Sequence, residues 1–236
     1  GIAHDFNNIL SAIFGYTELS LESLNSEKDL EAYLDNILEA SKRARDLVSH
    51  ILAFSRKAEL GKKPMVPQYT VKETLKLLRA SLPTTIEIRE SLKSTAAIMA
   101  NDTQIHQIVM NICSNAGYEM KKEGGILGVT LEEITVGSEM SHQYPELRPG
   151  NYLKLSISDT GGGIPKGVID RIFDPFFTTK PTGEGTGMGL AVVHGIVKSL
   201  GGEVMVSSHD GVGTTFKILL PIFETRAIEK AEVIAR

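Results

Sequence analysis

Two glycine-rich segments in the C-terminal half of the chain carry the residues best suited to hold a chain of phosphates. The first, residues 159–165, follows an expected strand, and the second, residues 183–190, opens an expected helix. Glycine lets a backbone approach a ligand closely, and N–H groups exposed at a helix start attract anions. Because a single G-x-G serves a simple turn just as readily, it is the pair that indicates a di- or triphosphate site.

Four further side chains are suited to complete such a site. Asp159 can accept a hydrogen bond from the exocyclic amine of adenine, whereas it would repel the carbonyl oxygen of guanine. Asn111 and Asn115 share one face of a long expected helix, and amide oxygens are acceptable ligands for Mg²⁺. Lys180, in a loop over residues 174–185 that is too long for a simple connection, could touch a terminal phosphate. The plainer alternatives are an aspartate that ends a strand and two solvated amides.

His4 is the strongest candidate for a nucleophile. A neutral imidazole nitrogen is nucleophilic near physiological pH, and the neighbouring Asp5 can accept the other ring N–H and orient the ring. Asn8 lies one helical turn on, on the same side as His4. An exposed helix histidine without a chemical role is the commoner case. Cys113 lies in an apolar helix stretch and is interpreted as a core residue.

Two helices are predicted for the first sixty residues, which contain no proline. Apolar residues step by three and four from Ile2 to Leu24 in two adjacent stripes, so the first helix buries more than one face. After a polar turn at residues 25–29, the second helix carries a heptad-like seam from Leu30 to Ile51. Because a lone hairpin of this kind leaves apolar surface uncovered, a four-helix bundle in a homodimer is expected.

The rest of the chain is predicted to be mixed α/β, after a linker at residues 61–68 where glycine and two prolines end the helical pattern. Leu153, Leu155 and Ile157 alternate with polar residues and predict a strand at 152–159. The other expected elements are helices at 71–82, 102–123 and 191–200, and strands at 86–91, 96–99, 125–134, 204–207 and 215–220. The expected fold class is α+β, with a helical hairpin followed by a mixed α/β domain.

Six segments, in order along the chain, resemble the sequence boxes of the sensor histidine kinases of two-component signalling. They are residues 4–8 (H box), 111–116 (N box), 159–163 (first G box), 172–177 (F box), 185–190 (second G box) and 211–216 (the terminal G-x-G-T-x-F). One box alone is weak evidence, whereas six in order over nearly the whole chain are highly specific. The resemblance implies a dimerisation and histidine-phosphotransfer hairpin at 1–60, a linker at 61–68, a catalytic ATP-binding α/β sandwich of the histidine kinase/Hsp90/gyrase/MutL type at 69–223, and a tail at 224–236.

The same resemblance implies ATP-dependent autophosphorylation of His4 and transfer of the phosphoryl group to an aspartate of a response-regulator receiver domain. Asn8 would position water for dephosphorylating that receiver. ATP and Mg²⁺ are the implied cofactors, with Asn115 foremost and Asn111 beside it as metal ligands. The residues expected to contact the nucleotide are Asn111, Asn115, Asp159, Gly161, Gly163, Ile164, Lys180, Gly185, Thr186, Gly187, Met188, Gly189, Leu190 and Thr214.

The residues after the N box depart from the family pattern. Many members carry a basic residue shortly after the Asn-Ala pair, where this chain has Gly117-Tyr118-Glu119. One phosphate contact therefore lacks its usual residue. The candidate replacements are Lys121, Lys122 and Lys180.

The bulk composition argues against several classes of protein. A net charge of -4 over 236 residues gives no electrostatic support for nucleic-acid binding, and no apolar run approaches the ~20 residues that span a bilayer. The single cysteine fits a reducing, cytoplasmic compartment. The start without methionine predicts a fragment of a longer protein, with an upstream sensor domain implied by the resemblance. Two other hypotheses stay open: an ATPase clamp of the same sandwich fold, and a non-catalytic dimerisation scaffold.

Overall fold

The chain divides into two compact units, Gly1–Glu59 and Leu60–Arg236. The computed structural model describes residues 2–22, 29–38, 40–41, 61–144, 146–181 and 185–223, with the backbone alone at 2–9, 142 and 143. Within these ranges, none of the helices has both the length and the apolar character that a membrane crossing requires.

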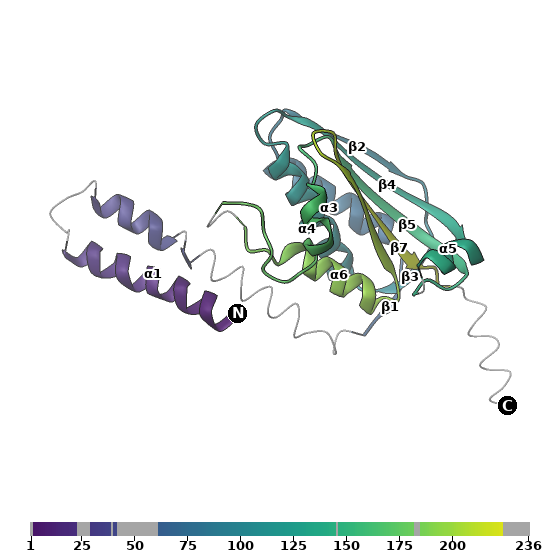
Figure 1. Ribbon diagram of the computed structural model, residues 1–236, viewed down its shortest axis with the longest axis horizontal. Coiled ribbons are helices and arrows are strands. Elements are labelled where there is room, and N and C mark those ends of the chain that lie inside the picture. Colours follow the sequence, from purple (N-terminus) through teal and green to yellow (C-terminus); the bar gives the residue numbers. More distant parts are fainter. Residues whose placement is uncertain are drawn as a thin grey trace. The chain divides into compact units, whose positions relative to one another are not determined.

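The first unit is helical. Helix α1 spans Ile2–Glu22, and residues 29–38 and 40–41 are also helical, as Figure 1 shows. The rings of Tyr16 and Tyr33 stack at 6.2 Å between centroids and join the two helices. Large apolar side chains nevertheless remain exposed in the single chain: Phe14, Leu21, Leu34 and Leu38. Both expected helices are therefore confirmed over the described residues, whereas most of the polar turn and the second half of the seam lie outside them.

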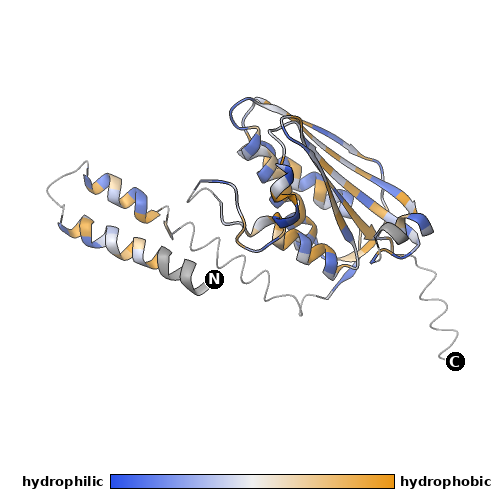
Figure 2. Cartoon of the chain, in the orientation of Figure 1, coloured by the Kyte–Doolittle hydropathy of each residue, from blue (hydrophilic) through white to orange (hydrophobic). Residues whose placement is uncertain are grey.

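The second unit is built on a five-stranded mixed sheet. Its order is β2 (Ile86–Leu92), β4 (Gly125–Val136), β5 (Gly150–Asp159), β7 (Gly213–Pro221) and β6 (Glu203–His209). The β2–β4 pair is parallel and the other pairs are antiparallel. Apolar and polar residues alternate along these strands (Figure 2), so one face of the sheet is made for a core.

Three helices cover that apolar face: α3 (Pro67–Ser81), α4 (Asp102–Glu119) and α6 (Gly189–Ser199) (Figure 1). The core between the layers is fully buried and includes Ile108, Ile112, Leu153, Leu155 and Ile218. A smaller cluster with Tyr152 and Leu219 lies on strands of the same sheet and packs beside the short helix α5 (Ser138–Gln143). A helical first unit followed by a layered α/β unit confirms the predicted α+β class.

Two local sequence signals fix the ends of the helices near the candidate site. Asn101 caps α4, because its side chain accepts the Gln104 N–H while the Gln104 side chain accepts the Asn101 N–H. Helix α6 ends where Gly201 takes a left-handed φ of +73° and the Gly202 N–H bonds back to the Val197 carbonyl. These two signals set where α4 begins and where α6 ends.

The largest departure from the expected elements is at residues 61–68, which were predicted to be a linker. Lys63–Met65 forms strand β1, which pairs antiparallel with β3 (Ile98–Ala100), and α3 already begins at Pro67. Proline is tolerated in the edge strand and at the first helical position, so Pro64 and Pro67 do not prevent either element. Helix α4 ends at Glu119 rather than at residue 123. After Glu119 the chain forms a turn, in which the Gly124 N–H donates a hydrogen bond to the Met120 carbonyl, and this turn leads into β4. The 3₁₀ helix Lys166–Arg171 completes the elements near the site.

Candidate functional site

Asp159 stands at the C-terminal end of the central strand β5 with one carboxyl oxygen engaged and the other open. Its Oδ1 accepts the backbone N–H of Gly161 at 2.9 Å and that of Thr214 at 3.3 Å. Among the described residues, none donates a hydrogen bond to Oδ2. Burial raises the pKa of the Asp159 carboxyl, although the two backbone hydrogen bonds oppose this rise. The arrangement leaves one oriented, partly desolvated acceptor for a ligand.

Glycines allow the first glycine-rich segment to pack against the turn between β6 and β7. Gly213 has φ +132°, and a Cβ there would lie 2.0 Å from the Asp159 carbonyl oxygen. Gly163 has φ +78°, and a Cβ there would lie 2.3 Å from the His209 carbonyl oxygen. Any side chain at either position would push the two segments apart. Gly161 and Gly163 thus lie in one wall with Asp159 and Thr214.

Ser208 is a member of this wall that the sequence analysis missed. Its Oγ accepts the Ile164 N–H at 2.7 Å and lies 2.9 Å from Thr214 Oγ1, which is itself buried. The hydroxyl therefore ties the first glycine segment to the last hairpin. The only signal in the sequence was a polar residue at the end of an alternating strand, which is too common to single out.

The second glycine-rich segment packs against the F box and against α4. Phe176 and Gly187 both have left-handed φ values, +68° and +65°, and their backbones are in contact. A Cβ on Gly189 would lie 3.4 Å from Asn111 Oδ1, so the first turn of α6 lies beside the Asn111 amide. Among the described side chains, none caps the start of α6, so its first N–H groups have no side-chain partner there.

The remaining candidate contact residues, Ile164 of the first segment included, fall into two groups. Thr186 and Gly185 lie in the loop, where Thr186 Oγ1 accepts the Met188 N–H at 3.4 Å and Gly185 lies against Thr178 and Lys180. Met188 is buried, and the side chains of Leu190 and Ile164 pack on the main core. The last three residues are therefore positioned to offer backbone, rather than side-chain, groups to a ligand.

Lys180 links the loop to α4 across 65 residues of sequence. Its Nζ donates a hydrogen bond to Asn115 Oδ1 at 3.1 Å and lies 4.0 Å from the centroid of the Tyr118 ring. The structure thus brings together Asn115 and Lys180, two of the candidate site residues. Lys121 and Lys122 are exposed in the turn after α4.

The metal-binding capacity of the site comes from amide oxygens. Within the described ranges, no group of three or more His, Cys, Asp or Glu side chains is arranged to hold a metal ion. Asn115 Oδ1 already accepts a cationic ammonium, which acts as a stand-in for a metal ion at that oxygen. Asn111, one turn earlier, presents its Oδ1 towards α6. These oxygens suit Mg²⁺, which takes few protein ligands and completes its shell with phosphate oxygens and water.

The candidate nucleophile lies in the other unit. His4, Asp5 and Asn8 are on α1, and their side chains lie outside the described residues. Cys113 is fully buried on α4, and burial raises the pKa of its thiol to about 12. A thiol of this kind is not a nucleophile at neutral pH, so its interpretation as a core residue holds.

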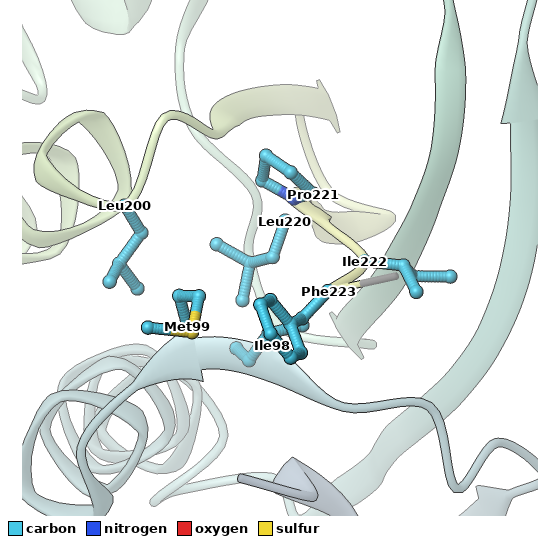
Figure 3. A pocket seen from close by; sticks show the side chains of 7 residues that line it. All are labelled: Ile98, Met99, Leu200, Leu220, Pro221, Ile222 and Phe223. Atoms are coloured by element: carbon cyan, nitrogen blue, oxygen red, sulfur yellow. The ribbon is translucent and has the colours of Figure 1, made fainter. Parts of the chain in front are cut away.

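An apolar pocket at the far end of α6 is not part of this site. It is lined by Ile98 and Met99 of β3, by Leu200 at the end of α6, and by residues 220–223 (Figure 3). Roughly 16 Å, the length of an 11-residue helix, separate it from the first turn of α6. A lining of apolar side chains offers no donors for phosphate.

Comparison with protein families bears directly on both units. The model of the histidine kinase-, DNA gyrase B- and HSP90-like ATPase family matches residues 100–224, which contain α4, both glycine segments, Lys180 and the last hairpin. The chain belongs to this ATPase family. The model of the His Kinase A (phospho-acceptor) domain matches residues 1–60. The two matches, in this order, confirm the resemblance to sensor histidine kinases.

Curated relatives of the family extend over nearly all of the chain. The sensor kinase CckA of Brucella abortus (strain 2308) is 38% identical over 240 aligned residues, covering 100% of this chain and 25% of that protein. The sensor histidine kinase ZraS of Escherichia coli (strain K12) is 30% identical over 228 residues, covering 96% of this chain and 45% of that protein. The chain therefore spans between a quarter and a half of the length of these relatives.

Solved structures share the fold. The histidine kinase ThkA, in complex with the response regulator protein TrrA, matches with a TM-score of 0.69 at 22% identity, over 94% of this chain and 60% of that one. The histidine kinase AdeS of Acinetobacter baumannii matches with a TM-score of 0.65 at 22% identity, over 94% and 98% of the two chains. At these identities the likeness concerns the fold.

Proposed function

We propose that this chain transfers the terminal phosphoryl group of ATP to His4 and then to an aspartate of a response-regulator receiver domain. The observation that carries the proposal is the wall around Asp159. There, an open carboxyl oxygen stands within one unit that also holds two glycine segments, the amides of α4 and a lysine ammonium. That unit follows a segment that matches a phospho-acceptor domain.

Asp159 is the residue proposed to select adenine. With Oδ1 held by Gly161 and Thr214, Oδ2 is the acceptor that remains for the exocyclic amine of the base. The wall of Gly161, Gly163, Ile164 and Thr214 would lie along the base and sugar. The residues from Gly185 to Leu190 would offer backbone N–H groups to the phosphates at the start of α6.

Asn115 and Asn111 are proposed to hold Mg²⁺ through their amide oxygens, and Lys180 to contact the terminal phosphate. Bound Mg²⁺ would neutralise charge on the phosphate oxygens during transfer. Lys180 is close enough to Asn115 that the lysine and the metal would share one region of negative charge. The amides would hold the metal, and the ammonium would contact the phosphate.

His4 is the proposed acceptor. Its imidazole nitrogen forms a bond to the γ-phosphorus while the bond from that phosphorus to the bridging oxygen breaks, and ADP leaves with the electron pair. Asp5 would accept the other ring N–H and hold the reactive tautomer. Asn8 would position water for hydrolysis of the phosphorylated receiver, giving a phosphatase activity.

The proposal assigns residues 1–60 to dimerisation and phosphotransfer, 69–223 together with β1 and the start of α3 to ATP binding, and 224–236 to a tail. A homodimer is supported by the exposed apolar side chains of the hairpin, such as Phe14 and Leu34, which a second copy would cover. A receiver partner is supported by the ThkA–TrrA complex. This chain covers 25% of CckA, which supports a longer parent protein; the proposal includes a cytoplasmic location for this segment and a sensor domain upstream of it in that parent.

Incubation with γ-labelled ATP and Mg²⁺ tests this function. We expect acid-labile, base-stable label on the protein, which is lost in His4→Gln and retained in His50→Gln, a matched histidine of the same N-terminal segment. Free phosphate with unlabelled protein would indicate the ATPase clamp instead. A protein that binds neither ATP nor ADP in Mg²⁺ buffer would be the dimerisation scaffold.

A further inference from the structure

The ammonium group of Lys180 is held on two sides by residues of one helix. Asn115 Oδ1 accepts its hydrogen bond at 3.1 Å, and the ring centroid of Tyr118 lies 4.0 Å from Nζ. Asn115 and Tyr118 are three residues apart on α4 and so lie on the same face. All three residues are partly buried, which strengthens both the charge-assisted hydrogen bond and the cation–π contact.

This contact bears on the missing basic residue after the N box. Position 117 is a buried glycine, where a Cβ would lie 2.3 Å from a methyl group at the end of the Leu82 side chain, so a longer side chain there would have to displace Leu82. Position 119 is an acid, Glu119. Of the three candidate replacements, Lys121 and Lys122 are exposed beyond the end of the helix, whereas Lys180 reaches Asn115.

We propose that Tyr118 is a positioning residue for Lys180: its ring holds the loop lysine at the N-box face, so that the cation normally carried by the helix is supplied from the loop. The inference rests on the proposed nucleotide site. A metal ion on Asn115 Oδ1 would take that oxygen away from Lys180, because the two cations compete for one acceptor. The Tyr118 ring is a contact that this competition does not remove, and it would help to keep the ammonium beside the terminal phosphate.

If the ammonium contacts the terminal phosphate, the pair should affect the binding of ATP and of ADP differently. The Tyr118–Lys180 pair should contribute to the binding of ATP and little to that of ADP, which lacks the phosphate that the ammonium contacts. Tyr118 should act only through Lys180, because its own ring offers the phosphate nothing but a hydroxyl. If Tyr118 served only in packing, its substitution would instead weaken the binding of both nucleotides to the same extent.

Calorimetric titration of the purified chain with ADP and with a non-hydrolysable ATP analogue, both in excess Mg²⁺, tests the inference. We expect Lys180→Met to weaken binding of the ATP analogue by ~10-fold, and Tyr118→Leu to weaken it by roughly 3- to 5-fold. The affinity of both variants for ADP should stay within ~2-fold of wild type. Tyr118→Phe keeps the ring face and should stay within ~2-fold for both ligands. Melting temperatures of the apo variants check that each is folded.

A double variant decides whether the two residues act together. Tyr118→Leu combined with Lys180→Met should bind the ATP analogue no more weakly than Lys180→Met alone, because the ring has no lysine left to hold. Additive losses, or equal losses for ADP and the ATP analogue in Tyr118→Leu, would overturn the inference while leaving the proposed function intact. Wild-type protein that binds neither nucleotide would instead overturn the proposed function.

Discussion

Gly187 lies directly against the backbone of Phe176, and a Cβ atom on Gly187 would come within 2.3 Å of the Phe176 carbonyl carbon. Gly187 also has φ +65°, which costs a residue with a side chain about 1–2 kcal/mol. We expect Gly187→Ala to displace the second glycine segment and to weaken ATP binding by at least ~10-fold, as measured by calorimetric titration.

The matched control for this substitution is Gly195→Ala in the middle of α6. In the part of the chain that the structure describes, nothing lies within 4 Å of a Cβ at Gly195, and alanine is favoured over glycine in a helix interior by about 0.5–1 kcal/mol. Gly195→Ala should therefore unfold at an equal or higher temperature and bind ATP as wild type does. Equal affinity of both variants for ATP would contradict the proposed role of the second segment.

Replacement of Asp159 by Asn should change the choice of base without unfolding the protein. The Asn Oδ1 can still accept the N–H groups of Gly161 and Thr214, which forces the amide NH₂ into the place of the open carboxyl oxygen. A donor there faces the donor amine of adenine, so we expect ATP affinity to fall by ~100-fold or more, with unpaired polar groups on both sides. The ratio of ATP to GTP affinity, measured by competition, should fall as well. A variant that keeps this ratio would exclude Asp159 as the base-selecting residue.

The raised pKa of Asp159 predicts two pH effects of opposite sign. Burial raises this pKa in the folded protein, so the folded state takes up the proton before the unfolded state does. The ionised carboxylate therefore subtracts from stability at neutral pH, and the loss is recovered as pH falls through the raised pKa. Asp159→Asn should melt higher than wild type at pH 7, by a margin that shrinks on acidification. Over the same window wild-type ATP affinity should fall, because protonation turns the acceptor into a donor.

Differential scanning calorimetry of the two proteins, from pH 7 down towards the ordinary Asp range, measures the first effect. The comparison of variant with wild type cancels the titration of all other groups. A margin that grows on acidification would mean that the two backbone hydrogen bonds outweigh burial and that the pKa is lowered.

Cys113 should resist alkylation until the chain unfolds. Burial raises the pKa of its thiol to about 12 and removes it from solvent, so the reactive thiolate is nearly absent at pH 8. With one cysteine in the chain, a single added mass reports the reaction. We expect iodoacetamide to label the urea-unfolded chain rapidly and the native chain only at its unfolding rate. Equal labelling of the two would place Cys113 outside the core.

The sequence alone predicted those elements and site residues whose type is restricted by chemistry or by periodicity. The alternation of Leu153, Leu155 and Ile157 predicted β5, and the residue types that suit phosphate and adenine brought Asn115, Asp159 and the two glycine segments to notice before any geometry was available. Strand β1 was not predicted, because its three residues around Pro64 show no alternation of apolar and polar side chains. They form a strand because they pair with β3. The Tyr118–Lys180 contact joins two segments far apart in the chain, and no local pattern records such a pair.

Strand β5 is hydrogen-bonded to β4 on one side and to β7 on the other, so the carboxylate at its end is anchored from both edges. Lys180 and residues 185–188, which are expected to face the phosphates, lie instead in the connection between the 3₁₀ helix and α6. The half of the candidate site that is expected to select the base is therefore carried by the sheet, and part of the phosphate half by a loop. Substitutions in the connection should alter how long a nucleotide resides on the protein, whereas discrimination between purines should follow the sheet alone.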